Sequence, residues 1–197
     1  MLTQLREFIQ KISRLFSPSL AIENERILEL MHQYKLFECS LENLYYFHQS
    51  HYTRNLIFKN EFFEILILCW EPGQKTPIHD HEGQHCCMTV LRGTIESKNY
   101  VYVKSIDFKG DLTPLLQETY NRGDVSYIDD EIGIHQLENP AINNRRACTL
   151  HVYYKPIVGC LSYDLETKTA KKVSLVYNRI IGQRDTHRIA QEISFLV

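Results

Sequence analysis

The sequence has no long apolar segment, no marked excess of charge and no secretory signal. No run approaches the roughly 18 to 20 consecutive apolar residues of a membrane span. The formal net charge is -2, from 22 Lys and Arg against 24 Asp and Glu, so long-range attraction to nucleic acid or anionic lipid is not expected. Residues 1–16 lack the apolar block and small-residue cleavage site of a secretory signal. We therefore expect a cytoplasmic protein with no nucleic acid and no membrane partner.

Residues 1–16 are nevertheless amphipathic and carry Arg6, Lys11 and Arg14, so a targeting helix is one interpretation. Glu7 and the spaced apolar residues fit a packed surface helix better.

The chain also lacks a CxxC pair and the regular cysteine spacing of a disulfide framework. In a cytoplasmic chain most cysteines should be reduced core thiols, and Cys69 in the apolar run EILILCW fits that expectation. Cys86 differs because it lies in HDHEGQHCCM (79–88), which holds three histidines. The six cysteines are Cys39, Cys69, Cys86, Cys87, Cys148 and Cys160.

No internal repeat or low-complexity linker divides the 197 residues, and a hydrophobic content of 44% suits one domain with a buried core. We predict a single domain over 1–197, with a helical part at 1–50, a β-barrel at 51–180 and a tail at 181–197. Apolar spacing predicts helices over about 2–16 and 20–36, and a short helix over about 186–194.

From about residue 54 the chain consists of short β-rich runs separated by Gly, Pro and Asn turns. Many short strands of this kind indicate a mainly β protein, a sandwich or barrel, rather than alternating α/β units. The predicted strands are 55–58, 62–70, 86–93, 95–103, 124–128, 135–139, 147–155, 161–166 and 171–177.

The motif HDH places His79 and His81 two residues apart. On a strand both imidazoles would point to one face while Asp80 points to the other. Neutral imidazole binds Fe, Zn, Cu and Ni, so the pair alone does not select a metal. A lone HxH is more often one surface histidine and one core histidine.

The run from Gly73 to Gly93 is similar to the first cupin motif, with Cys86 at its acidic position. His135 and Asn139 match the histidine and asparagine of the second motif, although Gly133 lies two residues before the histidine rather than three. This similarity makes His135 a third metal ligand. It also implies a cupin-type jelly-roll barrel with N-terminal α-helices.

A carboxylate ligand is not expected beside these histidines. Facial triads of two histidines and one carboxylate are the commoner non-haem iron sites. However, Glu82 follows His81 directly and would face away, and Glu96 lies beyond Gly93.

Four separated blocks resemble the cysteine dioxygenases, thiol dioxygenases of the cupin superfamily. HxH alone marks any cupin, whereas YTRN, HCC and LHVY in this order are typical of thiol dioxygenases. The blocks are HYTRNLIF (51–58), ILCWEPGQKTPIHDHEGQHCCMTVLRG (67–93), YIDDEIGIHQLEN (127–139) and TLHVYYKP (149–156).

The resemblance implies an iron site formed by His79, His81 and His135. It implies that Arg54, with Tyr52 beside it, binds the substrate carboxylate. A guanidinium can hold a carboxylate by two charge-assisted hydrogen bonds, which fixes its orientation.

The resemblance also implies a possible thioether between Cys86 and the ring of Tyr153. Cys87 should point to the opposite strand face and pack in the core. Thr149 and His151 share the strand face of Tyr153 and would orient it, and threonine stands where the family usually has serine.

The implied reaction is Fe(II)-dependent oxidation of L-cysteine by O2 to cysteine sulfinic acid, in a protein that we expect to be a monomer. The nearest alternative is a dioxygenase for 3-mercaptopropionate, but those relatives generally carry glutamine at the position of Arg54. A non-catalytic metal-binding cupin is the alternative of another class. It explains the histidines but gives no reason for Arg54, Cys86 and Tyr153 to occur together.

Overall fold

The fold is described by a computed structural model for residues 2–16, 24–103 and 111–181. The helix predicted over about 186–194 lies outside these residues, as does the start of the helix predicted over about 20–36. Within the described parts, no helix is long and apolar enough to cross a membrane.

Two α-helices precede the strands, and they agree with the predicted ones. Helix α1 spans Leu2–Leu15 and helix α2 spans Asn24–Tyr34. Lys35 adopts a left-handed conformation with φ of 42°, so the second helix ends at Tyr34, two residues before its predicted end at about 36. Two 3₁₀ turns, Leu36–Glu38 and Glu42–Leu44, then lead to the first strand.

One six-stranded sheet has the order β12-β1-β2-β9-β4-β7, with antiparallel pairing except between β12 and β1. Its strands are β1 (Thr53–Lys59), β2 (Phe63–Trp70), β4 (His85–Arg92), β7 (Val125–Ile128), β9 (Ala147–Tyr154) and β12 (Arg179–Ile180).

A second six-stranded sheet has the order β11-β10-β3-β8-β5-β6 and is antiparallel throughout. Its strands are β3 (Ile78–His79), β5 (Thr94–Val103), β6 (Asp111–Asn121), β8 (Ile134–Glu138), β10 (Gly159–Asp164) and β11 (Thr169–Ser174). The predicted mainly β fold with N-terminal helices is confirmed.

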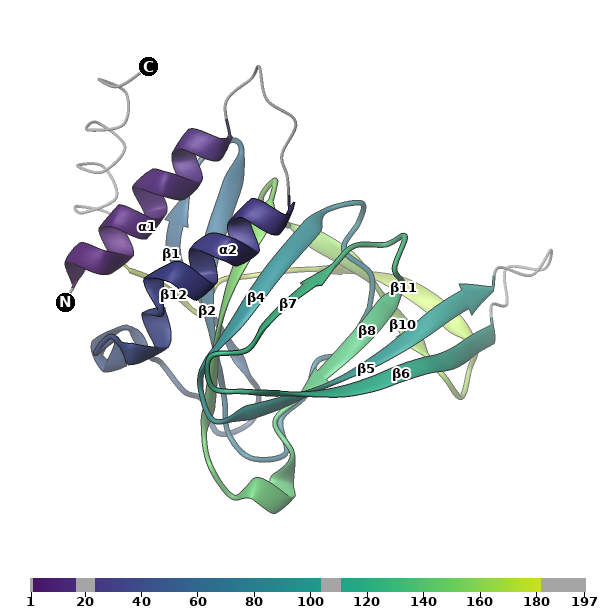
Figure 1. The fold of residues 1–197 in the computed structure, drawn as a ribbon. Coiled ribbons are helices and arrows are strands. Elements are labelled where there is room, and N and C mark those ends of the chain that lie inside the picture. The colour runs from purple at the N-terminus through teal and green to yellow at the C-terminus, as the bar shows by residue number, and fades with distance from the viewer. Residues whose placement is uncertain (1, 17–23, 104–110, 182–197) are drawn as a thin grey trace.

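The first sheet is covered on both faces. Helices α1 and α2 lie on its outer face, and the second sheet lies on the other side (Figure 1). Strands β2 and β9 are therefore buried along their whole length. This explains why EILILCW reads as a continuous apolar run rather than an alternating one.

The sequence pattern missed strand β6. Its segment DLTPLLQETYN contains Pro114 and several polar residues, which argue against a central strand. In the fold β6 is the edge strand of its sheet and pairs only with β5. On the unpaired side of an edge strand there is no neighbouring strand to accept a hydrogen bond, so proline, which has no amide hydrogen, is tolerated there. The register shifts between Asn99 and Tyr100, opposite Pro114.

Gly93 of the first cupin-like motif occupies the turn between β4 and β5. Its φ is 76°, and an added Cβ would lie 2.8 Å from the backbone oxygen of Arg146. Both the conformation and the close approach require glycine.

Candidate metal centre and substrate pocket

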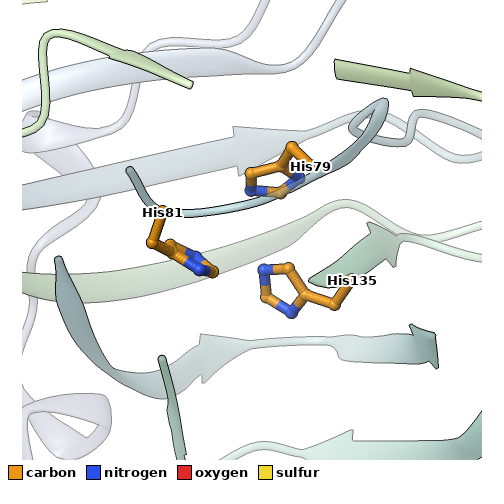
Figure 2. A group of neighbouring side chains, drawn as sticks. All are labelled: His79, His81 and His135. Atoms are coloured by element: carbon orange, nitrogen blue, oxygen red, sulfur yellow. The ribbon is translucent and has the colours of Figure 1, made fainter. Parts of the chain in front are cut away.

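Three histidines form the centre of the candidate site. One ring nitrogen from each of His79, His81 and His135 lies within 4.8 Å of the others, and Figure 2 shows the imidazoles turned toward one another. Among the described residues, this group contains no Asp, Glu or Cys. The sequence-predicted ligands are thus brought together.

The pairing of strands explains how residues far apart in the sequence meet. His79 on β3 is the register partner of His135 on β8. The prediction that HDH lies on one strand is only half right, because β3 ends at His79. His81 follows in irregular backbone, where its amide donates a 2.7 Å hydrogen bond to Asp130.

Asp80 points away from the histidine group, as the alternation predicts. Its carboxylate accepts hydrogen bonds from the backbone amide of Leu161 at 2.8 Å and from the hydroxyl of Tyr163 at 3.2 Å. These bonds fix the short HDH segment against strand β10.

The buried nitrogen atoms of this group fit a metal ion. Neither ring nitrogen of His81 has a hydrogen-bond partner, although the residue is only 1% exposed. Such an orphaned polar group is costly unless something else binds it. Nδ1 of His79 lies 3.0 Å from the carbonyl oxygen of Pro77, an arrangement that leaves Nε2 for a metal.

Burial keeps the three imidazoles neutral. It lowers the pKa of His79, and it lowers the pKa of His81 and His135 well below the usual value, with the neighbouring His79 adding to the effect. Neutral imidazole is the form that coordinates a metal.

A small cavity of about 80 Å³ opens beside the histidines. This volume is well above the roughly 10 to 15 Å³ that a cavity needs to hold one water. The cavity thus suits a ligand of a few non-hydrogen atoms. Its lining includes all three histidines together with Tyr52, Arg54, Cys86, Met88, His151, Tyr153, Cys160 and Leu175.

Arg54 supplies the positive charge of this cavity. Its side chain is buried, and Nε and Nη2 have no hydrogen-bond partner. These two nitrogens lie on one edge of the guanidinium, the edge that can receive both oxygens of a carboxylate. Tyr52, also in the lining, stacks on Trp70 with ring centroids 4.7 Å apart.

Strand β9 presents a row of polar side chains on its inner face. Trp70 donates a 3.1 Å hydrogen bond to the hydroxyl of Thr149, which lies 2.8 Å from Nε2 of His151. The ring of His151 stacks on that of Tyr153 at 5.9 Å. Burial lowers the pKa of His151 to about 3, with Arg54 contributing, so the ring is neutral. Trp70 belongs to the buried core and also anchors this row.

Cys86 and Tyr153 are register partners on β4 and β9. Directly opposite side chains have Cβ atoms about 4.5 to 5.5 Å apart, so the thiol lies beside the ring. Burial, together with neighbouring Cys87, raises the pKa of the Cys86 thiol, and burial raises that of the Tyr153 hydroxyl. Cys87 belongs to the core on the helix side, as alternation predicts.

Other residues around the site divide into those that line the cavity and those that do not. Nδ1 of His85 is 2.6 Å from the hydroxyl of Tyr127, outside the cavity lining. Cys160 and Leu175 line the cavity. Glu82 pairs with Lys172, and Glu96 accepts a hydrogen bond from Gln117. Neither glutamate joins the histidine group.

Glu64 is the residue that sequence reasoning missed. It is 0% exposed and lies 3.5 Å from Nη2 of Arg54. A single acid inside the apolar run FFEILILCW was the available signal, since a buried carboxylate needs a partner.

Comparison with known proteins gives one family. Residues 2–166 match the model of "Cysteine dioxygenase type I". The chain is 27% identical over 187 residues to "Cysteine dioxygenase type 1" from Danio rerio, covering 94% of this chain and 92% of the relative. It is 31% identical over 139 residues to the protein of that name from Rattus norvegicus, covering 70% and 68%.

Solved structures match more distantly. A protein from Klebsiella pneumoniae with a double-stranded β-helix domain is 14% identical with a TM-score of 0.44, covering 70% of this chain and 95% of that one. TT1209 from Thermus thermophilus is 17% identical with a TM-score of 0.44, covering 59% and 96%.

Proposed function

Because the chain belongs to the cysteine dioxygenase type I family, we propose that it oxidises L-cysteine with O2 to cysteine sulfinic acid at an Fe(II) centre. Both oxygen atoms transfer to sulfur, and the thiol substrate supplies all four electrons. No organic cofactor and no external reductant are required.

One observation carries this proposal. The unpartnered edge of Arg54 and the three neutral histidines line the same small cavity. A ligand with a carboxylate at one end and a thiol at the other can therefore occupy both at once. L-Cysteine is a small molecule that carries both groups.

The metal would be held by His79, His81 and His135. When bound, Fe(II) supplies a centre at which a thiol stays deprotonated and meets O2. The choice of iron over other metals that imidazole binds rests on the family.

Arg54 and Tyr52 would hold the carboxylate of the substrate. The guanidinium edge fixes its distance and orientation by two charge-assisted hydrogen bonds. Because Arg54 is buried, these bonds compete little with bulk water.

Tyr153 would direct its hydroxyl toward the substrate and the incoming oxygen. Its pKa is raised by burial, so it acts as a neutral hydrogen-bond donor. The hydrogen-bonded Trp70–Thr149–His151 row would keep its ring in place by stacking.

We also propose that Cys86 and Tyr153 form a thioether. Its formation removes one hydrogen from sulfur and one from the ring, and O2 is the oxidant. The register pairing of these two residues supports the crosslink.

Oxygen uptake by purified, Fe(II)-loaded protein tests the function. We expect uptake with L-cysteine and a product heavier by two oxygen atoms. Faster uptake with 3-mercaptopropionate would instead favour the alternative substrate. If the protein binds metal and neither thiol drives uptake, it is a non-catalytic metal-binding cupin. A monomeric state and a cytoplasmic location stay predictions.

A further inference from the structure

Glu64 is a buried carboxylate that the proposed reaction does not use. It lies in β2, next to the central strand β9, and is fully buried. It does not line the cavity, whereas Arg54 does. Glu64 is the register partner of Tyr153, and its carboxylate contacts Arg54 at Nη2 from outside the cavity lining.

Both oxygens of Glu64 have fixed partners. The backbone amide of Ile157 donates to Oε1 at 3.3 Å, and the hydroxyl of Tyr177 donates to Oε2. Oε1 also lies 3.5 Å from Nη2 of Arg54. These contacts tie three separate segments of the chain to one carboxylate.

A second contact fixes the backbone of Arg54. Its amide donates a 2.9 Å hydrogen bond to the side chain of Asn178, the residue after Tyr177. The segment after β11 thus reaches Arg54 both directly and through Glu64. Nε and Nη2 of Arg54 have no hydrogen-bond partner, although Nη2 forms the ion pair with Glu64.

We infer that Glu64, held by Tyr177 and the Ile157 amide, is a positioning residue that keeps the free edge of Arg54 directed into the cavity for the substrate carboxylate. This inference deepens the proposed function and rests on its assignment of Arg54. Glu64 itself does not touch the substrate.

Two effects of Glu64 on carboxylate binding oppose each other. Its negative charge repels a bound carboxylate, whereas its ion pair with Nη2 holds the guanidinium in place. The structure favours positioning because Glu64 is held by Tyr177 and the Ile157 amide, does not line the cavity, and contacts Arg54 only at Nη2, whereas Nε has no partner.

Glu64→Gln is the main test, since it keeps the size of the side chain. Glutamine has no negative charge, so the ion pair with Arg54 is lost, and it has one acceptor oxygen instead of two, so Tyr177 can no longer donate to the second position. The readout is anaerobic calorimetric binding of L-cysteine to the Fe(II)-loaded protein. Cysteamine, which has the thiol and amine but no carboxylate, is the comparison ligand. We expect the Kd for L-cysteine to rise by about tenfold and that for cysteamine to stay within about twofold.

Tyr177→Phe is the second variant, because it removes only a half-buried hydroxyl and leaves the core intact. It should raise the Kd for L-cysteine roughly threefold and leave that for cysteamine unchanged. Tyr120→Phe is the matched control, since it also breaks a tyrosine–glutamate hydrogen bond, to Glu118 on β6. Its Kd values should equal those of the wild type.

The outcomes separate this inference from the function. The inference is wrong if the Kd for L-cysteine stays unchanged or falls in both Glu64→Gln and Tyr177→Phe. An unchanged Kd would mean that Glu64 does not affect binding, and a lower Kd would mean that its charge mainly repels the substrate carboxylate. An equal rise for cysteamine, or no binding of L-cysteine by the wild type, also overturns it. If the wild type binds L-cysteine and consumes no oxygen, the proposed function fails while the binding comparison still tests Glu64.

Discussion

Strands β4 and β9 have two faces of opposite character. The face toward the second sheet carries Cys86, Thr149, His151 and Tyr153, all at or beside the cavity. The other face packs against the helices. It carries Cys87, Leu91, Cys148, Leu150 and Val152.

The difference shows how one pair of buried strands serves two purposes. Because alternate side chains point to opposite faces, neighbours in sequence such as Cys86 and Cys87 enter different environments. The helix-side face contributes mainly apolar area, and the cavity-side face positions polar groups. Substitutions on the first face should therefore change stability, and substitutions on the second should change binding and chemistry.

The largest effect is expected for His81→Ala. It removes one of three metal ligands, so bound Fe(II) should fall from about one per chain to below about one tenth, and oxygen uptake should stop. His85→Ala is the control, because His85 stacks on Tyr154 outside the cavity. Metal analysis after dialysis gives the answer, and full occupancy in His81→Ala would contradict the ligand assignment.

On the helix-side face, Leu150→Ala should destabilise without altering binding. Leu150 is 0% exposed, and such truncations cost about 2 to 5 kcal/mol. The KM for L-cysteine should stay within about twofold. Met88→Ala on the cavity-side face should cost less stability and change the KM, because Met88 lines the cavity. Urea unfolding measures the free energy of unfolding, and oxygen-uptake kinetics measure the KM. If Leu150→Ala changes mainly the KM and Met88→Ala mainly the stability, the proposed division between the two faces is wrong.

Arg54→Ala should raise the KM for L-cysteine by about 10 to 100-fold, the equivalent of a lost charge-assisted interaction of about 1.5 to 3 kcal/mol. Arg146→Ala, which breaks an exposed pair with Glu71, should leave the KM unchanged. Oxygen-uptake kinetics compare the two variants. Equal KM values for wild type and Arg54→Ala would exclude Arg54 as the carboxylate site.

Much of the fold and the ligand group was predictable because each depends on local periodicity. Strands such as β4 and β9 follow from alternating or continuous apolar runs, and helix α1 from its spaced apolar residues. The histidine group followed from motif spacing, since HDH and the later His135 match a known pattern.

The parts that were missed depend on position in the tertiary structure. Pro114 is acceptable in β6 only because that strand is an edge, and sequence alone does not give strand order. Glu64 is acceptable in a buried run only because Arg54 and Tyr177 lie beside it. Tyr177 is 113 residues away in the chain, so no local pattern joins the two.

The smallest expected effect is a difference in intact mass that distinguishes Cys86 from Cys87. A thioether should lower the intact mass of the wild type by two hydrogen atoms, and Cys86→Ala should lose this difference while Cys87→Ala keeps it. Cys87 is a suitable control because its sulfur lies 3.1 Å from the hydroxyl of Tyr154, yet its register partner is Val152.

The sulfurs of Cys69 and Cys148 lie 3.9 Å apart, and a disulfide there would give the same mass change. The samples are therefore reduced with dithiothreitol and denatured before mass measurement, because a thioether resists thiol exchange and a disulfide does not. If Cys86→Ala keeps the mass difference, or if the reduced wild type shows none, Cys86 does not form the crosslink.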